Sequence, residues 1–176
     1  GNALQRLCRM DEAAQAIDAA LKANPEHAVY RLNKSSFLAA NGRHVEALEW
    51  AENAIAADPG YTEARLKKAS LLIQTGDLEA GFREYEARWS MPGWHALPSK
   101  LPMPSWRGED VAKKTLLVWN EQGFGDALIY ARYLPLLTAS GARVRLMCEK
   151  PLIRLFKNSF GAAVDIHPLD GPPPEA

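Results

Sequence analysis

The apolar residues of the N-terminal half recur at intervals of three and four, which is the spacing of one face of an α-helix. Residues 28–42 follow this pattern and end on a glycine, which accepts the left-handed conformation beyond a helix end. Residues 43–59 repeat the pattern and place Ala47, Ala51 and Ala54 on one face. A proline near their end closes the helix, since the residue before a proline disfavours helical angles. The pattern therefore predicts pairs of closely packed helices.

The same landmarks return 34 residues later along this helical region. A fixed period of this length is the signature of a helical repeat array, in which each helix pair packs against the next pair. We therefore predict one partial repeat and two full repeats over residues 1–89. The landmarks that share the period are Pro25 and Pro59, Gly42 and Gly76, and Ala13, Ala47 and Gly81.

Residues 90–113 separate these repeats from the rest of the chain. They contain four prolines, which exclude a continuous helix. They also contain two tryptophans, and aromatic residues are rare in disordered linkers. We expect this segment to be an ordered strap across the junction of two domains.

The pattern changes again after the strap. The predicted elements are a strand at residues 115–119, a helix at 127–140 kinked at Pro135, a strand at 142–149, a helix at 151–160 with Pro151 in its first turn, and a strand at 162–168. Strands that alternate with helices form parallel, right-handed units. The predicted fold class is therefore mixed: an N-terminal all-α solenoid, followed at residues 114–176 by a partial α/β, Rossmann-like β-α-β-α-β unit. Three strands leave a sheet edge and helix faces uncovered, so this unit looks truncated or leans on the repeats.

Composition narrows the classes of function. Lysine and arginine together number 21, aspartate and glutamate together also number 21, and the formal net charge is zero. Binders of nucleic acid or membrane surfaces carry a clustered basic excess, so neither partner is expected. Cys8 and Cys148 lie too far apart in sequence to indicate a disulfide framework or a metal site. No apolar run has the length of a membrane helix, and we expect a cytoplasmic protein without a metal.

The segment EQGFGD at residues 121–126 links the first predicted strand to the next helix, where α/β folds bind ligands. A dinucleotide-binding loop would need a third glycine where Leu128 stands, and the chain has no Gly-Lys-Ser/Thr of a Walker A loop. Asp126 at a helix start would also repel a pyrophosphate. Two interpretations remain: Asp126 caps the helix N-terminus, or its carboxylate serves as a general base.

The layout of helix, glycine turn, helix and proline at this period resembles the tetratricopeptide repeat. Three segments of the second half are WRG at residues 106–108, KTLLVWNEQGFGDALIYARYLPLL at 114–137 and GARVRLMCEKPLIRLF at 141–156. They resemble bacterial proteins that join such repeats to a glycosyltransferase domain related to the ADP-heptose (family-nine) enzymes. This resemblance covers essentially the whole chain, and EQGFGD is its most specific part.

The resemblance implies an enzyme of the GT-B class, in which two Rossmann-like domains face each other across a cleft without an obligatory metal. The chain would be a fragment with the repeats and the acceptor-side domain, inactive by itself because the donor-binding domain is absent. A nucleotide-sugar donor is expected only for the full-length parent. The resemblance makes Asp126 the base that deprotonates the acceptor hydroxyl in an inverting transfer. The residues implied to line the site are Glu121, Gln122, Gly123 and Gly125.

Repeats of this kind usually bind a protein or peptide along their concave face. Family geometry places five residues from each of two successive repeats on that face. Asn33 falls where some members carry an asparagine ladder, but Lys67 stands at the next rung, so no ladder is expected. The ten residues are Val29, Leu32, Asn33, Ser36 and Ala39, followed by Glu63, Leu66, Lys67, Ser70 and Ile73.

Two functions stay open. The first is a protein-binding repeat module joined to the acceptor-side part of a nucleotide-sugar-dependent inverting glycosyltransferase, with a glycan or protein as acceptor. The second is a non-enzymatic scaffold or adaptor, whose α/β part is a degenerate cap on the solenoid. An RNA-binding repeat is disfavoured by the zero net charge and the lack of a basic stripe.

Overall fold

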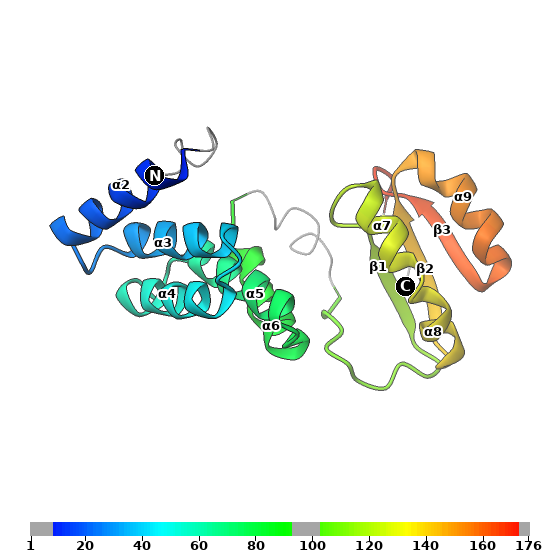
Figure 1. Cartoon of the computed structure of the whole chain (residues 1–176). Coiled ribbons are helices and arrows are strands. Elements are labelled where there is room, and N and C mark those ends of the chain that lie inside the picture. Colours follow the sequence, from blue (N-terminus) through cyan, green and yellow to red (C-terminus); the bar gives the residue numbers. More distant parts are fainter. Residues whose placement is uncertain (1–8, 93–102, 173–176) are drawn as a thin grey trace. The chain divides into compact units, whose positions relative to one another are not determined.

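The computed structural model describes residues 9–92 and 103–172 (Figure 1). The chain divides into two compact units, residues 1–100 and residues 101–176. We call them the repeat unit and the α/β unit, and each is described by itself.

The repeat unit is built from helices that pack against their neighbours in chain order (Figure 1). Helix α3 packs along α4, α4 along α5, and α5 along α6. The predicted period therefore corresponds to successive helical hairpins. The helices are α2 (Met10–Ala23), α3 (Ala28–Ala40), α4 (His44–Ala57), α5 (Thr62–Thr75), α6 (Leu78–Tyr85) and the 3-10 helix η1 (Glu86–Ser90).

Two glycines end the first helix of successive hairpins. Gly42 lies just after α3 with a φ of 75°, and Gly76 lies just after α5 with a φ of 96°. Residues other than glycine rarely adopt a positive φ. The N–H groups of Gly76 and Asp77 donate to the carbonyl oxygens of Ile73 and Leu72 at 3.2 and 2.9 Å, which satisfies the end of α5. The helix ends predicted at both glycines are confirmed.

Small residues let the paired helices approach closely. Ala47 on α4 is fully buried, and the Ser35 hydroxyl on α3 donates a hydrogen bond to the Ala47 carbonyl oxygen at 2.6 Å. Gly81 takes the place of Ala47 in the next hairpin. A Cβ atom on Gly81 would lie 2.6 Å from Ile73 Cγ1 and 3.2 Å from the Ala69 carbonyl oxygen. The small residues at the repeat period are therefore contact positions between paired helices.

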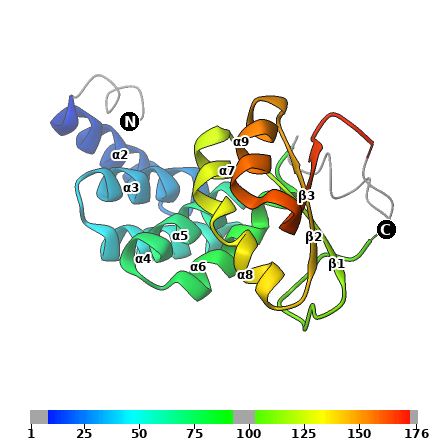
Figure 2. The same cartoon turned by 90° about the vertical axis from the view of Figure 1, so that its right-hand side faces the viewer.

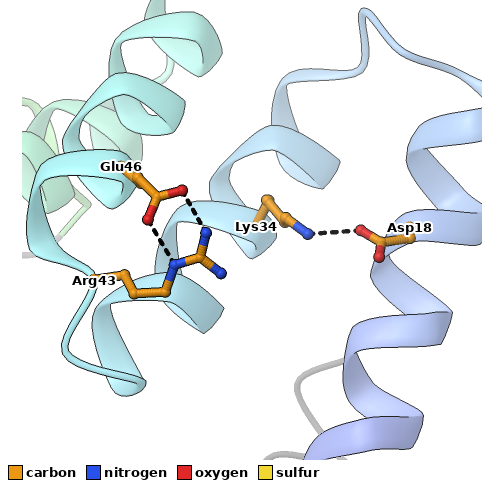
Figure 3. A network of polar contacts seen from close by, with 4 residues as sticks. All are labelled: Asp18, Lys34, Arg43 and Glu46. Atoms are coloured by element: carbon orange, nitrogen blue, oxygen red, sulfur yellow. Dashed lines mark hydrogen bonds and ion pairs between the residues drawn. The ribbon is translucent and has the colours of Figure 1, made fainter.

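Ion pairs between successive helices share the same period. Lys34 on α3 pairs with Asp18 on α2 at 2.7 Å, as Figure 3 shows. Lys68 on α5 pairs with Glu52 on α4 at 2.9 Å. Pairs this close to solvent contribute up to about 1 kcal/mol each. These pairs therefore show that successive helices pack in the same register, but they add little to the stability of the repeat unit.

The strap predicted at residues 90–113 lies partly outside the described residues, which resume at residue 103. Trp106 Nε1 donates a hydrogen bond to the Glu109 carbonyl oxygen at 2.8 Å, and the Glu109 carboxylate accepts one from the Arg107 N–H at 2.8 Å. Val111 is buried in the core of the α/β unit. The end of the strap is thus ordered by local contacts and anchored to the α/β core.

The α/β unit contains a parallel sheet with the strand order β1-β2-β3 (Figure 1). Thr115 on β1 pairs with Arg143 on β2, and Val144 on β2 pairs with Val164 on β3. The elements are β1 (Thr115–Trp119), α7 (Phe124–Ala131), α8 (Leu134–Ala139), β2 (Arg143–Cys148), α9 (Lys150–Phe160), the 3-10 helix η3 (Gly161–Ala163) and β3 (Val164–Pro168).

Helices α7, α8 and α9 lie together on one face of this sheet (Figure 2). The apolar core between the sheet and these helices includes Val144 and Leu146 from β2. Ala131, Leu134 and Phe156 fill it from the helix side. This layer holds the carboxyl ends of β1 and β2 beside the start of α7.

The central strand β2 has two different faces. Leu146 and Cys148 are buried in the core, whereas Arg145 forms a cross-strand ion pair with Asp165 on β3, with Nε and Oδ2 3.7 Å apart. A strand covered by helices on both faces is usually apolar throughout. Within residues 103–172 the helices cover one face, so the sheet is a small parallel one and the Rossmann-like, doubly wound arrangement stays a prediction.

The single helix predicted at residues 127–140 is wrong, because the structure has two helices there. Pro135 cannot donate a hydrogen bond to the Ala131 carbonyl oxygen, and its ring clashes with that carbonyl in a continuous helix. Helix α7 accordingly ends at Ala131, and α8 begins at Leu134 with the proline in its first turn. Pro135 therefore starts a helix rather than kinking one.

The strand predictions need smaller corrections. The strand at residues 115–119 has the predicted bounds. The strand predicted at 142–149 is one residue shorter at each end. The strand predicted at 162–168 begins at Val164, because the preceding residues complete the 3-10 turn η3.

Candidate functional site

The ten residues predicted to bind a partner lie on two neighbouring helices. Five come from α3 and five from α5, and these two helices contact each other. Val29, Glu63 and Ser70 are exposed, and the other seven are partly exposed. We call this set the repeat face: Val29, Leu32, Asn33, Ser36, Ala39, Glu63, Leu66, Lys67, Ser70 and Ile73.

The other sides of α3 and α5 belong to the core of the repeat unit. Ser35 and Leu38 on α3 are buried, as are Ala64, Ala69 and Leu71 on α5. These core positions alternate with the repeat-face positions at helical spacing. The repeat face is therefore the side of each helix that the hairpin packing leaves accessible to a partner.

Lys67 is the cation of the repeat face. It is half-buried, and this burial lowers the pKa of its ammonium group. Lys34 and Lys68 each pair with a carboxylate on the preceding helix. Within residues 9–92, neither Glu63 one turn earlier nor another carboxylate forms an ion pair with Lys67. Lys67 is thus a partly desolvated cation suited to an anionic group from a partner.

The second predicted site is the loop at residues 121–126. Asp126 lies in the first turn of α7, and the N-cap of this helix is Gly123, with φ −65° and ψ 176°. No side chain accepts a hydrogen bond at this helix end, so the interpretation of Asp126 as the cap is wrong. Its carboxylate is exposed and forms no ion pair within residues 103–172. A carboxylate in a first turn is favoured by the positive end of the helix.

The two glycines of this loop are not required by the packing of the chain. Neither has a positive φ, and a Cβ atom on Gly123 or Gly125 would meet no atom within 4 Å. Gly81 differs, since its Cβ would collide with the neighbouring helix. The space beside Gly123 and Gly125 is open, which allows a bound molecule to approach the backbone closely.

Asn120 and Glu149 belong to the same edge of the sheet, and sequence reasoning did not name them. Asn120 follows β1 directly, and Glu149 follows β2 directly. Asn120 Nδ2 donates hydrogen bonds to the Gln122 carbonyl oxygen at 3.1 Å and to the Glu149 carboxylate. The carboxyl ends of neighbouring parallel strands lie at the same edge of a sheet. The positions of Asn120 and Glu149 at the carboxyl ends of two predicted strands could therefore have identified both residues from the sequence. Asn120 therefore ties the start of the loop to the next strand.

The loop brings its predicted residues to the carboxyl edge of the sheet, but not into a single closed cluster. Glu121, Gly125 and Asp126 are exposed, and Gln122 is linked to the edge through its backbone. Among the described residues, no group of histidine, cysteine, aspartate or glutamate side chains is arranged to hold a metal ion. No helix in the described ranges is long and apolar enough to cross a membrane.

Residues 1–62 match the family described as Tetratricopeptide repeat. The match includes α2, α3 and α4, and with them the first half of the repeat face. The N-terminal helices are therefore a repeat module of the type that mediates protein interactions.

The chain is also similar to longer proteins. It is 26% identical to Protein FlbA of Caulobacter vibrioides over 198 aligned residues, which is 90% of this chain and 33% of FlbA. It is 37% identical over 79 residues to the TPR repeat-containing thioredoxin TTL4 of Arabidopsis thaliana, 45% of this chain and 12% of that protein. The Inactive TPR repeat-containing thioredoxin TTL3 of the same plant is 34% identical over 79 residues. The chain spans about a third or less of the length of these relatives.

Proposed function

We propose that the repeat unit binds a segment of another protein across the repeat face, and that this segment places a carboxylate beside Lys67. The observation that carries the proposal is the half-buried ammonium group of Lys67, which has no ion-pair partner within residues 9–92. A partly desolvated charge is costly until an opposite charge meets it. The repeat match over residues 1–62 supports protein binding as the general role.

Apolar side chains on the repeat face supply the rest of the contact. Leu32 and Leu66 occupy equivalent positions in successive repeats and are partly exposed, as is Ile73. Val29 at the start of α3 is 41% exposed. A bound segment would therefore combine apolar contacts with one charge-assisted contact, a common composition for a protein interface.

Selection of peptides from a random display library on the immobilised chain tests this proposal. The selected peptides are expected to share an acidic residue. Lys67→Gln should weaken their binding by about tenfold or more, because the charged contact is lost. Lys68→Gln is the matched control, since Lys68 already pairs with Glu52 and is not on the repeat face. Fluorescence polarisation measures both affinities, and equal binding by the two variants would remove Lys67 from the site.

We further propose that the α/β unit is the acceptor-side part of a nucleotide-sugar-dependent inverting glycosyltransferase in the complete, cytoplasmic protein. The loop lies at the carboxyl edge of a parallel sheet, where α/β folds bind ligands. The exposed carboxylate of Asp126 and the open space beside Gly123 and Gly125 support an acceptor site there. Glu121 and Gln122 would add hydrogen bonds to the acceptor, which is a glycan or a protein.

In this reaction Asp126 would accept the proton of the acceptor hydroxyl as the hydroxyl oxygen attacks the anomeric carbon of the sugar. The bond from that carbon to the nucleotide diphosphate breaks, and its electron pair leaves with the diphosphate. Attack from the opposite side inverts the anomeric configuration. In an enzyme of this kind a second domain would hold the nucleotide-sugar donor.

Asp126→Asn in the complete protein tests the base. Transfer from a panel of nucleotide-sugars should fall by about 100- to 10,000-fold, the usual range for loss of a general base, with an unchanged Tm. Asp165→Asn on β3 is the control carboxylate and should retain activity. Full activity of Asp126→Asn would remove Asp126 as base. If the complete protein transfers no sugar while peptide binding persists, the alternative holds: a scaffold whose α/β unit caps the solenoid.

A further inference from the structure

The outward side of α7 is apolar, although a helix that covers a sheet normally turns polar residues to solvent. Ala127 and Ala131 are buried in the core, whereas Ile129 on the other side of the helix is 53% exposed. Large apolar side chains that gather in an exposed position on one helix often mark a place that another molecule covers. The large exposed apolar residues on and beside α7 are Phe124, Leu128, Ile129, Tyr130, Tyr133 and Leu136.

Two charges flank Ile129, one in the first turn of α7 and one directly after its last residue. Asp126 comes three residues before Ile129, and Arg132 comes three residues after it. The Arg132 guanidinium lies 5.0 Å from the centre of the Tyr133 ring, and its Nη2 donates to the Tyr133 hydroxyl at 3.1 Å. Arg132 is therefore held in place on this surface. Within residues 103–172 neither Asp126 nor Arg132 forms an ion pair.

A second, antiparallel copy of the same helix complements each of these features. In a two-fold pair of helices, positions equidistant from the axis meet each other. With Ile129 on the axis, Asp126 meets Arg132 of the second copy, and Tyr133 meets Gly125 of the second copy. A Cβ atom on Gly125 would meet no atom within 4 Å, so the tyrosine ring has room there. Arg132 and Tyr133 lie between α7 and α8 with right-handed backbone angles, which places both side chains next to the end of α7.

We propose that the outer side of α7 docks a second copy of this chain, with Ile129 on the two-fold axis and an Asp126–Arg132 ion pair on each side. A standard stable interface buries about 800 Å² per partner, and a helix of eight residues such as α7 offers less than that. The dimer is therefore expected to form reversibly at micromolar concentration.

Pairing has a consequence for the loop. The dimer covers the carboxylate of Asp126, which the proposed glycosyl transfer uses as its base. Pairing and acceptor binding at Asp126 therefore exclude each other, and the dimer is a resting form of the α/β unit. The dimer itself does not rest on the catalytic proposal, because molecular mass and not activity reports it.

Sedimentation equilibrium of the chain, from low to high micromolar concentration, tests the interface. The wild-type chain should show a monomer–dimer equilibrium, and Ile129→Glu should abolish it. Asp126→Arg and Arg132→Asp should each weaken the dimer about tenfold or more, because like charges then face each other. The two reversals combined should restore it. Val45→Glu, at an exposed apolar residue of the repeat unit, is the control and should leave the dimer unchanged.

The reversal variants keep the test independent of folding, because both side chains are exposed and each variant is checked by its circular dichroism spectrum and Tm. A chain that stays monomeric at high micromolar concentration overturns the proposal. A dimer that survives Ile129→Glu places the interface elsewhere. A combined variant that dimerises no better than the single reversals overturns the antiparallel pairing of Asp126 with Arg132.

Discussion

In the repeat unit, contacts between neighbouring helices recur 34 residues apart, whereas each contact of the α/β unit is made once. Lys34 and Asp18 join two helices in the same way as Lys68 and Glu52 join the next two. The hydrogen bonds of Asn120 at the sheet edge have no such counterpart. A recurring contact is supported independently at two places in the sequence, while a unique contact depends on one arrangement of the sheet.

The two units also fill their cores differently. The tightest contacts of the repeat unit involve alanine, glycine and serine, which bring helix backbones close together. The core of the α/β unit is filled by larger side chains between the sheet and three helices, such as Leu134, Leu146 and Phe156. Core substitutions should therefore destabilise the α/β unit by leaving cavities. In the repeat unit they should destabilise the fold through steric clashes or lost hydrogen bonds.

The largest effect is expected for Phe156→Ala on α9. Phe156 is 3% exposed in the α/β core, so its truncation should lower the free energy of unfolding of that unit by about 3–5 kcal/mol. Denaturant unfolding followed by circular dichroism and tryptophan fluorescence measures the loss. Leu155→Ala, at the exposed neighbouring residue, is the control and should change little. The repeat-unit transition should stay in place, and an equal fall in both transitions would show that the units unfold as one.

Gly81→Ala should have the next largest effect, and it acts on the repeat unit. The new Cβ would lie 2.6 Å from Ile73 Cγ1 and 3.0 Å from the Ile73 backbone nitrogen, so α5 and α6 must move apart. The free energy of unfolding should fall by about 1–3 kcal/mol in the same denaturation experiment. Gly125→Ala on α7 is the matched control, because its Cβ meets no atom within 4 Å. A harmless Gly81→Ala would contradict the close approach of the two helices.

Ser35→Ala is expected to cost about 1 kcal/mol, the usual net value of one hydrogen bond. Ser35 is fully buried and its hydroxyl donates to the Ala47 carbonyl oxygen at 2.6 Å, so its loss removes one hydrogen bond between α3 and α4. Ser36→Ala, one residue along on the repeat face, should leave stability unchanged. Thermal unfolding of the two variants distinguishes them, and equal Tm values would argue against a structural role for the Ser35 hydroxyl.

The smallest effects should come from exposed ion pairs, one in each unit. The Arg43 guanidinium, drawn with Glu46 in Figure 3, lowers the pKa of that carboxyl through hydrogen bonds. Lys150 lowers the pKa of Asp170 in the same way. A carboxyl whose pKa is lowered by folding stabilises the protein above its unfolded pKa, and this contribution is lost as the pH falls through the folded pKa.

Substitution of each cation tests these shifts. Arg43→Gln should raise the pKa of Glu46 towards its ordinary value and leave Asp170 unchanged, and Lys150→Gln should do the reverse. Titration of the carboxyl carbons by NMR measures both values. A Glu46 pKa that does not move in Arg43→Gln would mean that the guanidinium does not cause the shift.

The helices of the repeat unit could be predicted because their signals are local. A glycine with positive φ ends a helix at Gly42 and Gly76, and spacings of three and four assign residues to faces. The ten positions of the repeat face are predicted from the resemblance to the tetratricopeptide repeat. That Lys67 forms no ion pair within residues 9–92 could not be predicted, because it depends on which carboxylates of other helices come within reach.

The order of strands and helices in the α/β unit could be predicted from the sequence. The ends of α7 and the contacts of the loop before it could not. The end of α7 depends on the ring of Pro135 meeting the carbonyl of Ala131, which the helical pattern of apolar residues does not register. The cap of α7 is set by the extended backbone of Gly123 and not by the nearest aspartate. Asn120 and Glu149 meet across 29 residues of sequence, because two parallel strands end at one edge.

The recurrence of the Lys34–Asp18 and Lys68–Glu52 pairs has a consequence for the length of the array. His27 and Tyr61 precede α3 and α5 at equivalent positions, so a second copy of residues 28–61 inserted after Tyr61 would start in a native-like turn. Its Lys34 would meet the Glu52 already present, and its own Glu52 would meet Lys68. The insertion would extend the repeat face by one repeat. Each new contact between neighbouring helices would be equivalent to one that the chain already has. Repeat number is thus an adjustable dimension of this protein, open to tandem duplication in evolution and to engineering.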